Sequence, residues 1–91
     1  ESTKSFIISP NPNVGQFIVE YPKHKGIILM ETTLTIMNPT GEVEAQVTLN
    51  EENRKASFNL SGKQKGTYFV KASRVSKEGK EKTHIERIVI Q

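Results

Sequence analysis

The chain has 91 residues, which suffice for one small domain and leave no room for a second core. It contains no cysteine, which excludes disulfides and thiolate chemistry, and no apolar run approaches the roughly 20 residues of a membrane-spanning helix. The net charge of +3 is unevenly spread, because three lysines accompany seven glutamates in residues 1–53 whereas ten Lys and Arg accompany three glutamates in residues 54–91.

Apolar and polar residues alternate with a period of two along most of the chain. In "QFIVEY", Phe17, Val19 and Tyr21 share one face. In "EVEAQVTLN", every second residue from Val43 to Leu49 is apolar, so these side chains are expected to face the core. Turn sequences such as "NPTG" and "SGKQKG" separate the runs. Seven strands are predicted, at residues 5–9, 15–21, 30–38, 42–49, 54–60, 66–75 and 82–91.

This pattern predicts an all-β fold, an immunoglobulin-like antiparallel β-sandwich of about seven strands. No window has the 3.6-residue period of a helix, and β-branched residues dominate the apolar set. The sequence shows no linker, internal repeat or low-complexity tract, so residues 1–91 are interpreted as a single domain. Because the sequence begins at Glu1 without a methionine, we interpret it as a fragment of a longer protein.

The stretch "SPNPNVG" stands between the first two predicted strands. Pro10 and Pro12 cannot donate a ladder hydrogen bond, and Asn11 is pushed towards an extended conformation by the proline that follows it. Gly15 can take the positive φ that turns the chain into the next strand. The stretch therefore predicts a rigid corner between two strands.

The sequence gives little support for catalysis. Its two histidines, His24 and His84, have no partner at metal-ligand spacing, and the chain contains no aspartate. Glu51 and Glu52 adjoin in a predicted turn, where carboxylates are usually solvated. We predict no enzymatic activity, no catalytic residues, no metal and no cofactor.

Two further features suggest partners. The basic half of the chain could meet an anionic partner, although a lysine-rich outer sheet face is the more common explanation. Phe69, Lys71 and Ser73 share one strand face, but one aromatic residue with one lysine is a weak nucleic-acid signature, so no nucleic-acid partner is predicted. The apolar terminal stretch "RIVIQ" either closes the sandwich or is offered to the sheet edge of a partner.

Four segments in order resemble a known family: "ISPNPNVGQFIVEY", "LTIMNPTGEV", "LSGKQKGTYFVKA" and the terminal "ERIVIQ". Their spacing, from about Ser5 to Gln91, is similar to that of the C-terminal sorting domain of cargo proteins of the type IX secretion system, also called the Por secretion system. The residues that match the family motifs, and that the resemblance implies are used in sorting, are Pro10, Asn11, Pro12, Gly15, Gly41, Gly66, Tyr68, Val70, Lys71, Ile88, Val89, Ile90 and Gln91.

The resemblance implies an immunoglobulin-like fold and the role of a sorting signal in exported proteins of the Bacteroidetes. Cargo of this kind passes through the periplasm and reaches the outer-membrane surface or the extracellular space. The implied partners are the outer-membrane translocon, a shuttle barrel and a sortase-like protease. That protease removes the domain and attaches the cargo to anionic lipopolysaccharide.

Two positions depart from the family pattern. Lys63, Gln64 and Lys65 stand where the family usually has an apolar residue, and Asn38 and Pro39 replace the usual "DL". Both departures fall in loops, so we expect loop contacts to differ more than the fold.

Other interpretations remain open from the residues alone. One alternative is an adhesive or structural immunoglobulin-like module, and another is a domain retained on a component of the secretion apparatus. A further hypothesis is a homodimer formed by exchange of the apolar terminal strand.

Overall fold

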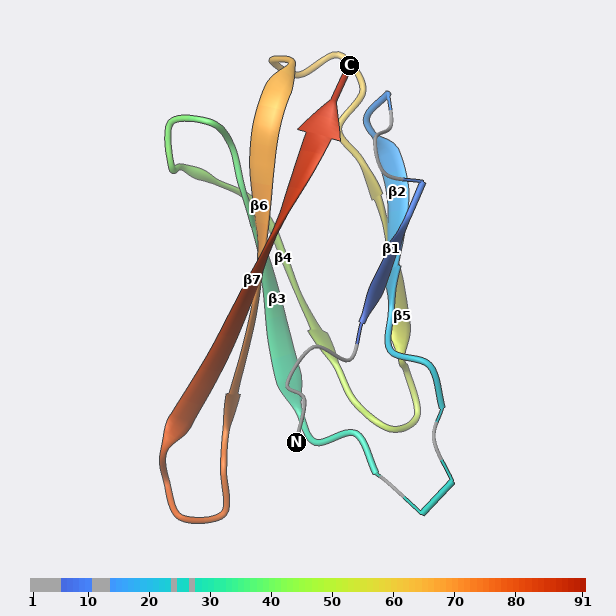
Figure 1. The fold of residues 1–91 in the computed structure, drawn as a ribbon, viewed down its shortest axis with the longest axis vertical. Helices are drawn as coiled ribbons and strands as arrows, with labels where there is room; N and C mark the ends of the chain where they lie inside the picture. The colour runs from blue at the N-terminus through green and yellow to red at the C-terminus, as the bar shows by residue number, and fades with distance from the viewer. Residues whose placement is uncertain (1–5, 11–13, 24, 27) are drawn as a thin grey trace.

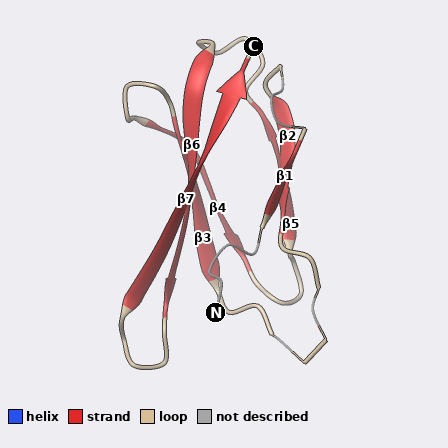
Figure 2. Ribbon diagram, viewed as in Figure 1, coloured by secondary structure: helices blue, strands red, loops and turns tan. Residues whose placement is uncertain are grey.

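The computed structural model describes residues 6–10, 14–23, 25–26 and 28–91. These residues form strands and no helix, so none of them belongs to a helix long and apolar enough to cross a membrane. The strands pack as two sheets face to face (Figures 1 and 2). Their bounds are β1 (Ile7–Ser9), β2 (Gln16–Glu20), β3 (Thr32–Met37), β4 (Val43–Leu49), β5 (Lys55–Asn59), β6 (Gly66–Val75) and β7 (Glu81–Ile90).

Both sheets are antiparallel throughout. One has three strands in the order β1-β2-β5, and the other has four in the order β4-β3-β6-β7. The longest pairing joins β6 to β7 over ten residue pairs, from Gly66–Ile90 to Val75–Glu81. The architecture confirms the predicted all-β sandwich, and each predicted strand is present within two residues of its expected bounds.

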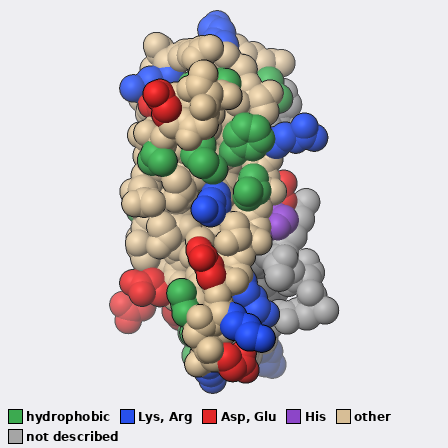
Figure 3. Space-filling model, turned by 90° about the vertical axis from the view of Figure 1, so that its left-hand side faces the viewer, with side chains coloured by type: hydrophobic (Ala, Val, Ile, Leu, Met, Phe, Trp, Pro, Cys, Tyr) green, Lys and Arg blue, Asp and Glu red, His purple; other side chains and the backbone are tan. Residues whose placement is uncertain are grey.

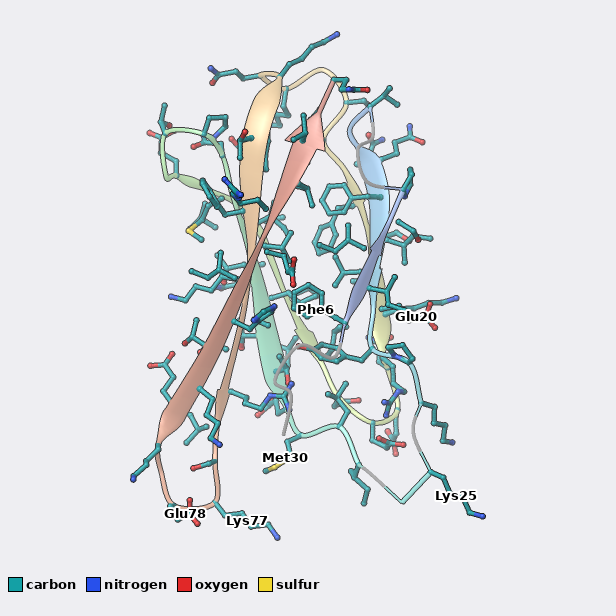
Figure 4. All side chains as sticks on the ribbon, viewed as in Figure 1. Phe6, Glu20, Lys25, Met30, Lys77 and Glu78 are labelled. Carbon is teal, nitrogen blue, oxygen red and sulfur yellow. The ribbon has the colours of Figure 1, made fainter. Side chains whose placement is uncertain are left out.

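The core lies between the two sheets and is built from side chains at alternate strand positions. Phe17 stacks on its cross-strand partner Phe58, with ring centroids 5.3 Å apart. Phe6 lies between the sheets (Figure 4) and meets the edge of the Tyr21 ring at 5.5 Å. The buried apolar residues are Phe6, Phe17, Val19, Tyr21, Leu29, Leu34, Ile36, Leu49, Leu60, Tyr68, Val70, Ala72, Ile88 and Ile90.

The prediction that Val43 faces the core is wrong. Ala45 pairs with Ile36, whereas the next pair joins Val43 to Met37, so Glu44 is an extra residue in a β-bulge. One extra residue reverses the alternation of side chains, and Val43 is therefore 60% exposed on the outer face of the sheet. Beyond the bulge, the alternate residues of β4 face the core as predicted, half-buried at first and fully buried at its end.

A polar network ties the segment after β2 to the turn between β4 and β5. The Arg54 guanidinium donates to the carbonyl oxygens of Tyr21, at 2.9 Å, and Pro22, at 2.7 Å. Glu51 pairs with Arg54 and accepts the backbone N–H of Leu29 at 2.7 Å. That hydrogen bond, followed by the nearby positive charge of Arg54, lowers the pKa of Glu51. Glu51 is thus a half-buried turn carboxylate that anchors two segments through its hydrogen bond and ion pair.

Candidate functional site

The segments that carry the family motifs meet at one end of the sandwich, at the top of Figure 1. Among the described residues, this end is formed by Pro10 and residues 14–16, 38–42, 60–67 and 88–91, and we call it the motif end. The β6 residues Tyr68, Val70 and Lys71 follow directly below it. Stretches from the beginning, middle and end of the sequence thus converge on one small surface.

Gly15 joins the early motif to the late one. Its carbonyl oxygen accepts the Leu60 N–H at 2.6 Å. Its φ is +111°, and a Cβ at this position would lie 2.6 Å from the backbone nitrogen of Ser61. Both the conformation and the close approach of a second backbone therefore require glycine. The glycine at the end of "PNPNVG" is needed because "LSG" packs directly against it.

Within the proline corner, Pro10 directly follows the end of β1. Pro10 is exposed, and the peptide bond between Ser9 and Pro10 is cis. Asn11 and Pro12 lie outside the described residues, so the predicted conformation of the corner between them stays a prediction. The described part agrees with a turn that ends β1 before β2 begins.

Tyr68 anchors the loop between β5 and β6. Its ring is fully buried, and its hydroxyl donates to the Gln64 carbonyl oxygen at 2.5 Å. Burial raises the pKa of the Tyr68 hydroxyl, and the negative charge of Glu44 raises it further. Gly66, with φ +136°, begins β6 and lies against the Pro39 ring, since a Cβ there would sit 3.4 Å from the proline Cγ. The late motif thus shapes a loop more than it exposes side chains.

Asn38 organises the turn between β3 and β4. It is buried, and its side-chain oxygen accepts hydrogen bonds from the backbone N–H groups of Thr40, at 3.0 Å, and Glu42, at 2.9 Å. The Gly41 N–H returns to the Asn38 carbonyl oxygen at 2.9 Å, and Gly41 takes φ +92°. An Asx-type turn of this kind needs the short oxygen-bearing side chain at its first position.

The two departures from the family pattern meet at one side chain. The Asn38 side-chain amide donates to Glu44 at 3.0 Å and also reaches Glu42 at 3.3 Å. Lys63 approaches the other oxygen of Glu44 at 3.4 Å. An aspartate at position 38 would place its charge beside two glutamates, whereas asparagine donates to both. The asparagine and the lysine are therefore linked through the glutamate at the β4 bulge.

The terminal strand completes the core at the motif end. Ile88 and Ile90 are buried between the sheets, and Ile88 pairs with Tyr68. Val89 points to the opposite face and is 43% exposed, and Gln91 is exposed. β7 is an edge strand, hydrogen-bonded to β6 on one side. The predicted apolar character of both faces is confirmed.

Among the residues that the structure describes, the remaining titratable groups form no cluster that suggests catalysis. His84 Nε2 lies 2.7 Å from a carboxylate oxygen of Glu86, and its ring meets Phe6 edge-on at 5.5 Å. His24 lies outside the described residues. Within the described ranges, no group of three or more His, Cys, Asp or Glu side chains could hold a metal ion.

Comparison with known proteins identifies the family. A family model described as "Secretion system C-terminal sorting domain" matches residues 7–91. The chain belongs to this family. No curated protein matches the chain. This family comprises the C-terminal sorting domains of type IX secretion. The domain is therefore a C-terminal signal for type IX export. Cargo of this system is exported to the cell surface or the extracellular space.

Among the described motif residues of this sorting domain, Gly15 is buried against Ser61, and the others divide into two groups. Tyr68, Val70, Ile88 and Ile90 are buried, so their side chains are not available to another protein in the folded state. The exposed or half-buried motif residues are Pro10, Gly41, Gly66, Lys71, Val89 and Gln91.

The sequence marked Asn38 as a departure from the family pattern but did not indicate its bonding role, and it did not indicate Glu44 or Ser61 as parts of this end. An asparagine directly before Pro-Thr-Gly was the available signal for the first of these. The other two become visible only when the sheets are paired.

Proposed function

We propose that export depends on the folded motif end, with the exposed residues contacted by the secretion apparatus and the buried ones holding them in place. The observation that carries this proposal is the convergence of the family motifs at the end where the matched region of the chain finishes. Pro10, Gly41, Val89 and Gln91 are the exposed motif residues there. Asn11 and Pro12 are included in the proposal through their place in the motif. In this role the domain is a substrate of the machinery and not a catalyst.

We further propose the route and partners that the family resemblance implies. The cargo crosses the periplasm, is bound by the outer-membrane translocon and a shuttle barrel, and is then cut from this domain by a sortase-like protease. The protease attaches the cargo to anionic lipopolysaccharide. Mass spectrometry of surface cargo tests this step: loss of the domain together with a lipopolysaccharide adduct supports it, and an intact domain on surface cargo contradicts it.

The proposal for the motif end is tested by placing one short tag at either end of the sandwich. A tag after Gln91 extends the motif end, whereas the same tag between Lys77 and Glu78 lies in the exposed turn at the opposite end (Figure 4). The fused cargo is a fluorescent protein targeted to the periplasm of a bacterium with a type IX system. We expect export to fail only with the tag after Gln91. Equal export of both fusions, each shown to be folded by its melting curve, would contradict the proposal.

A homodimer formed by exchange of β7 remains a separate proposal. It is supported by the position of β7 at a sheet edge and by the two buried isoleucines that a second copy would receive. Sedimentation across a wide concentration range tests it, and a constant monomer mass would count against exchange.

A further inference from the structure

The outer face of the four-stranded sheet carries apolar side chains that the core does not use. Val43, Met37 and Phe69 lie side by side across β4, β3 and β6, and Arg87 of β7 completes the row. These residues point outward because their strand neighbours, such as Ile36, Val70 and Ile88, are buried. The bulge at Glu44 is what brings Val43 into this row.

Two residues of the terminal strand extend the row. Ile85 and Val89 stand two positions to either side of Arg87, and their side chains share its face. Val43, Ile85 and Val89 are 60%, 53% and 43% exposed. Figure 3 shows hydrophobic side chains gathered in the upper half of this face. We call Met37, Val43, Phe69, Ile85 and Val89 the outer patch.

The outer patch differs from the surfaces around it. Farther from the motif end, the same face carries mostly hydroxyl and amide side chains, and Gln46 there donates to the Thr35 hydroxyl at 3.0 Å. The outer face of the three-stranded sheet carries two exposed isoleucines, Ile7 and Ile18, among more numerous polar side chains. A shallow hollow there is lined by Phe17, Ile18 and Phe58 together with polar side chains such as Ser9, Gln16 and Ser57. Apolar side chains collected on one face beside polar ones are typical of interaction surfaces.

Two cationic side chains, Lys71 and Arg87, lie among the residues of the outer patch. Lys71 pairs in register with Ile85, and Arg87 pairs with Phe69. Neither cation has an ion-pair partner within the part of the chain that the structure describes. An occupant that covered the outer patch without a carboxylate would bury unpaired charge, which is strongly unfavourable. The patch therefore favours an occupant that brings negative charge together with apolar side chains.

Other occupants fit this surface less well. A second copy docked face to face through a two-fold axis would bring the Lys71 and Arg87 of both copies together. A membrane surface is usually bound through clusters of about four to eight basic residues, and the outer patch has two. A nucleic acid would need more aromatic residues interleaved with cations than Phe69 alone provides.

We propose that the outer patch docks a protein surface whose apolar side chains are bracketed by carboxylates, with Lys71 and Arg87 as the specific contacts. This inference rests on the proposed function, because it names the chemistry of one partner that the sorting domain meets during export. It also gives the terminal strand two roles: its inward residues complete the core, and its outward residues Ile85, Arg87 and Val89 contact the partner.

The first test reverses the two charges in the fluorescent cargo fusion. We expect Lys71→Glu with Arg87→Glu to lower surface export at least tenfold, and Lys71→Arg with Arg87→Lys to preserve it. The matched control, Lys25→Glu with Lys77→Glu, makes the same change in net charge at the end opposite the motif end (Figure 4). Melting curves confirm that each variant is folded. Normal export of the charge-reversed variant overturns this inference and leaves the proposed function standing, whereas failure of the unmodified fusion to be exported overturns both.

The second test determines the chemistry of the occupant. A benzophenone amino acid replaces Ile85, and the crosslinked peptide is sequenced. A peptide from another protein that contains Asp or Glu supports the inference if changing that acid to lysine restores export of the charge-reversed variant. A crosslink to a second copy of this chain overturns it. Sedimentation of the domain with vesicles containing 30% phosphatidylglycerol, if abolished by charge reversal, overturns it in favour of a membrane.

Discussion

Ile88 and Val89 are adjacent in β7, but their side chains lie on opposite faces. Ile88 is fully buried between Tyr68 and the facing sheet, whereas Val89 is 43% exposed. Truncating a buried isoleucine to alanine costs about 2–5 kcal/mol, because the cavity that it leaves closes only in part. Truncating a partly exposed valine in a strand costs less than about 1 kcal/mol. We therefore expect Ile88→Ala to destabilise the domain several times more than Val89→Ala.

The free energy of unfolding of both variants is measured by urea denaturation, with far-ultraviolet circular dichroism as the signal. For a domain of this size, a loss of 1 kcal/mol lowers Tm by about 4–8 °C, so Ile88→Ala should lower the Tm of a thermal melt by at least about 8 °C. Equal losses of stability in the two variants would refute the assignment of faces in β7.

Truncation of the terminal strand should destabilise the domain for the same reason. Deleting residues 88–91 removes two buried isoleucines and costs about 4–10 kcal/mol. The total free energy of unfolding expected for 91 residues is about 5–14 kcal/mol. Loss of export on truncation therefore reports unfolding as readily as loss of a contact. For this reason Val89 and Gln91, which are exposed, are the informative positions at this end.

Three further predictions follow from the polar and glycine contacts. Gly15→Ala should lose at least about 2 kcal/mol, because the positive φ and the close backbone of the late motif both oppose a Cβ, and an unchanged urea midpoint would contradict this. In a double-mutant cycle on urea midpoints, Asn38→Asp and Lys63→Ala should not be additive, because both side chains meet Glu44, and additive losses would exclude that coupling. The lowered pKa of Glu51 stabilises the fold above its ordinary value of 4.5, and this contribution is lost as pH falls through the lower folded-state pKa. The stability difference between the native chain and Glu51→Gln should therefore shrink below about pH 4.5, and a difference independent of pH would contradict the role of the carboxylate.

The strands and most of the core are predictable from the sequence because alternation is a local signal. The alternation around Leu34 and Ile36, and around Tyr68 and Val70, indicates within a few residues that these side chains face the core. Val43 does not, because the extra residue of the bulge becomes visible only when β4 is paired with β3.

The motif end is predictable only in part. Family motifs indicate which segments matter, but not that Gly15 touches Ser61 or that Asn38 and Lys63 share Glu44. These contacts join residues far apart in the chain, and local patterning carries no information about them. The outer patch was signalled by Phe69 on one face with Lys71 and by the apolar terminal strand, but not as one surface, because its members come from four strands.

The most direct test of the account compares export with and without this domain. Residues 1–91 are fused to a fluorescent protein that carries a periplasmic targeting signal, and surface fluorescence is measured in a bacterium with a type IX system and in a strain without its translocon. We expect surface fluorescence that needs both the domain and the translocon. Fluorescence confined to the periplasm, with the fused domain shown to be folded, would contradict it.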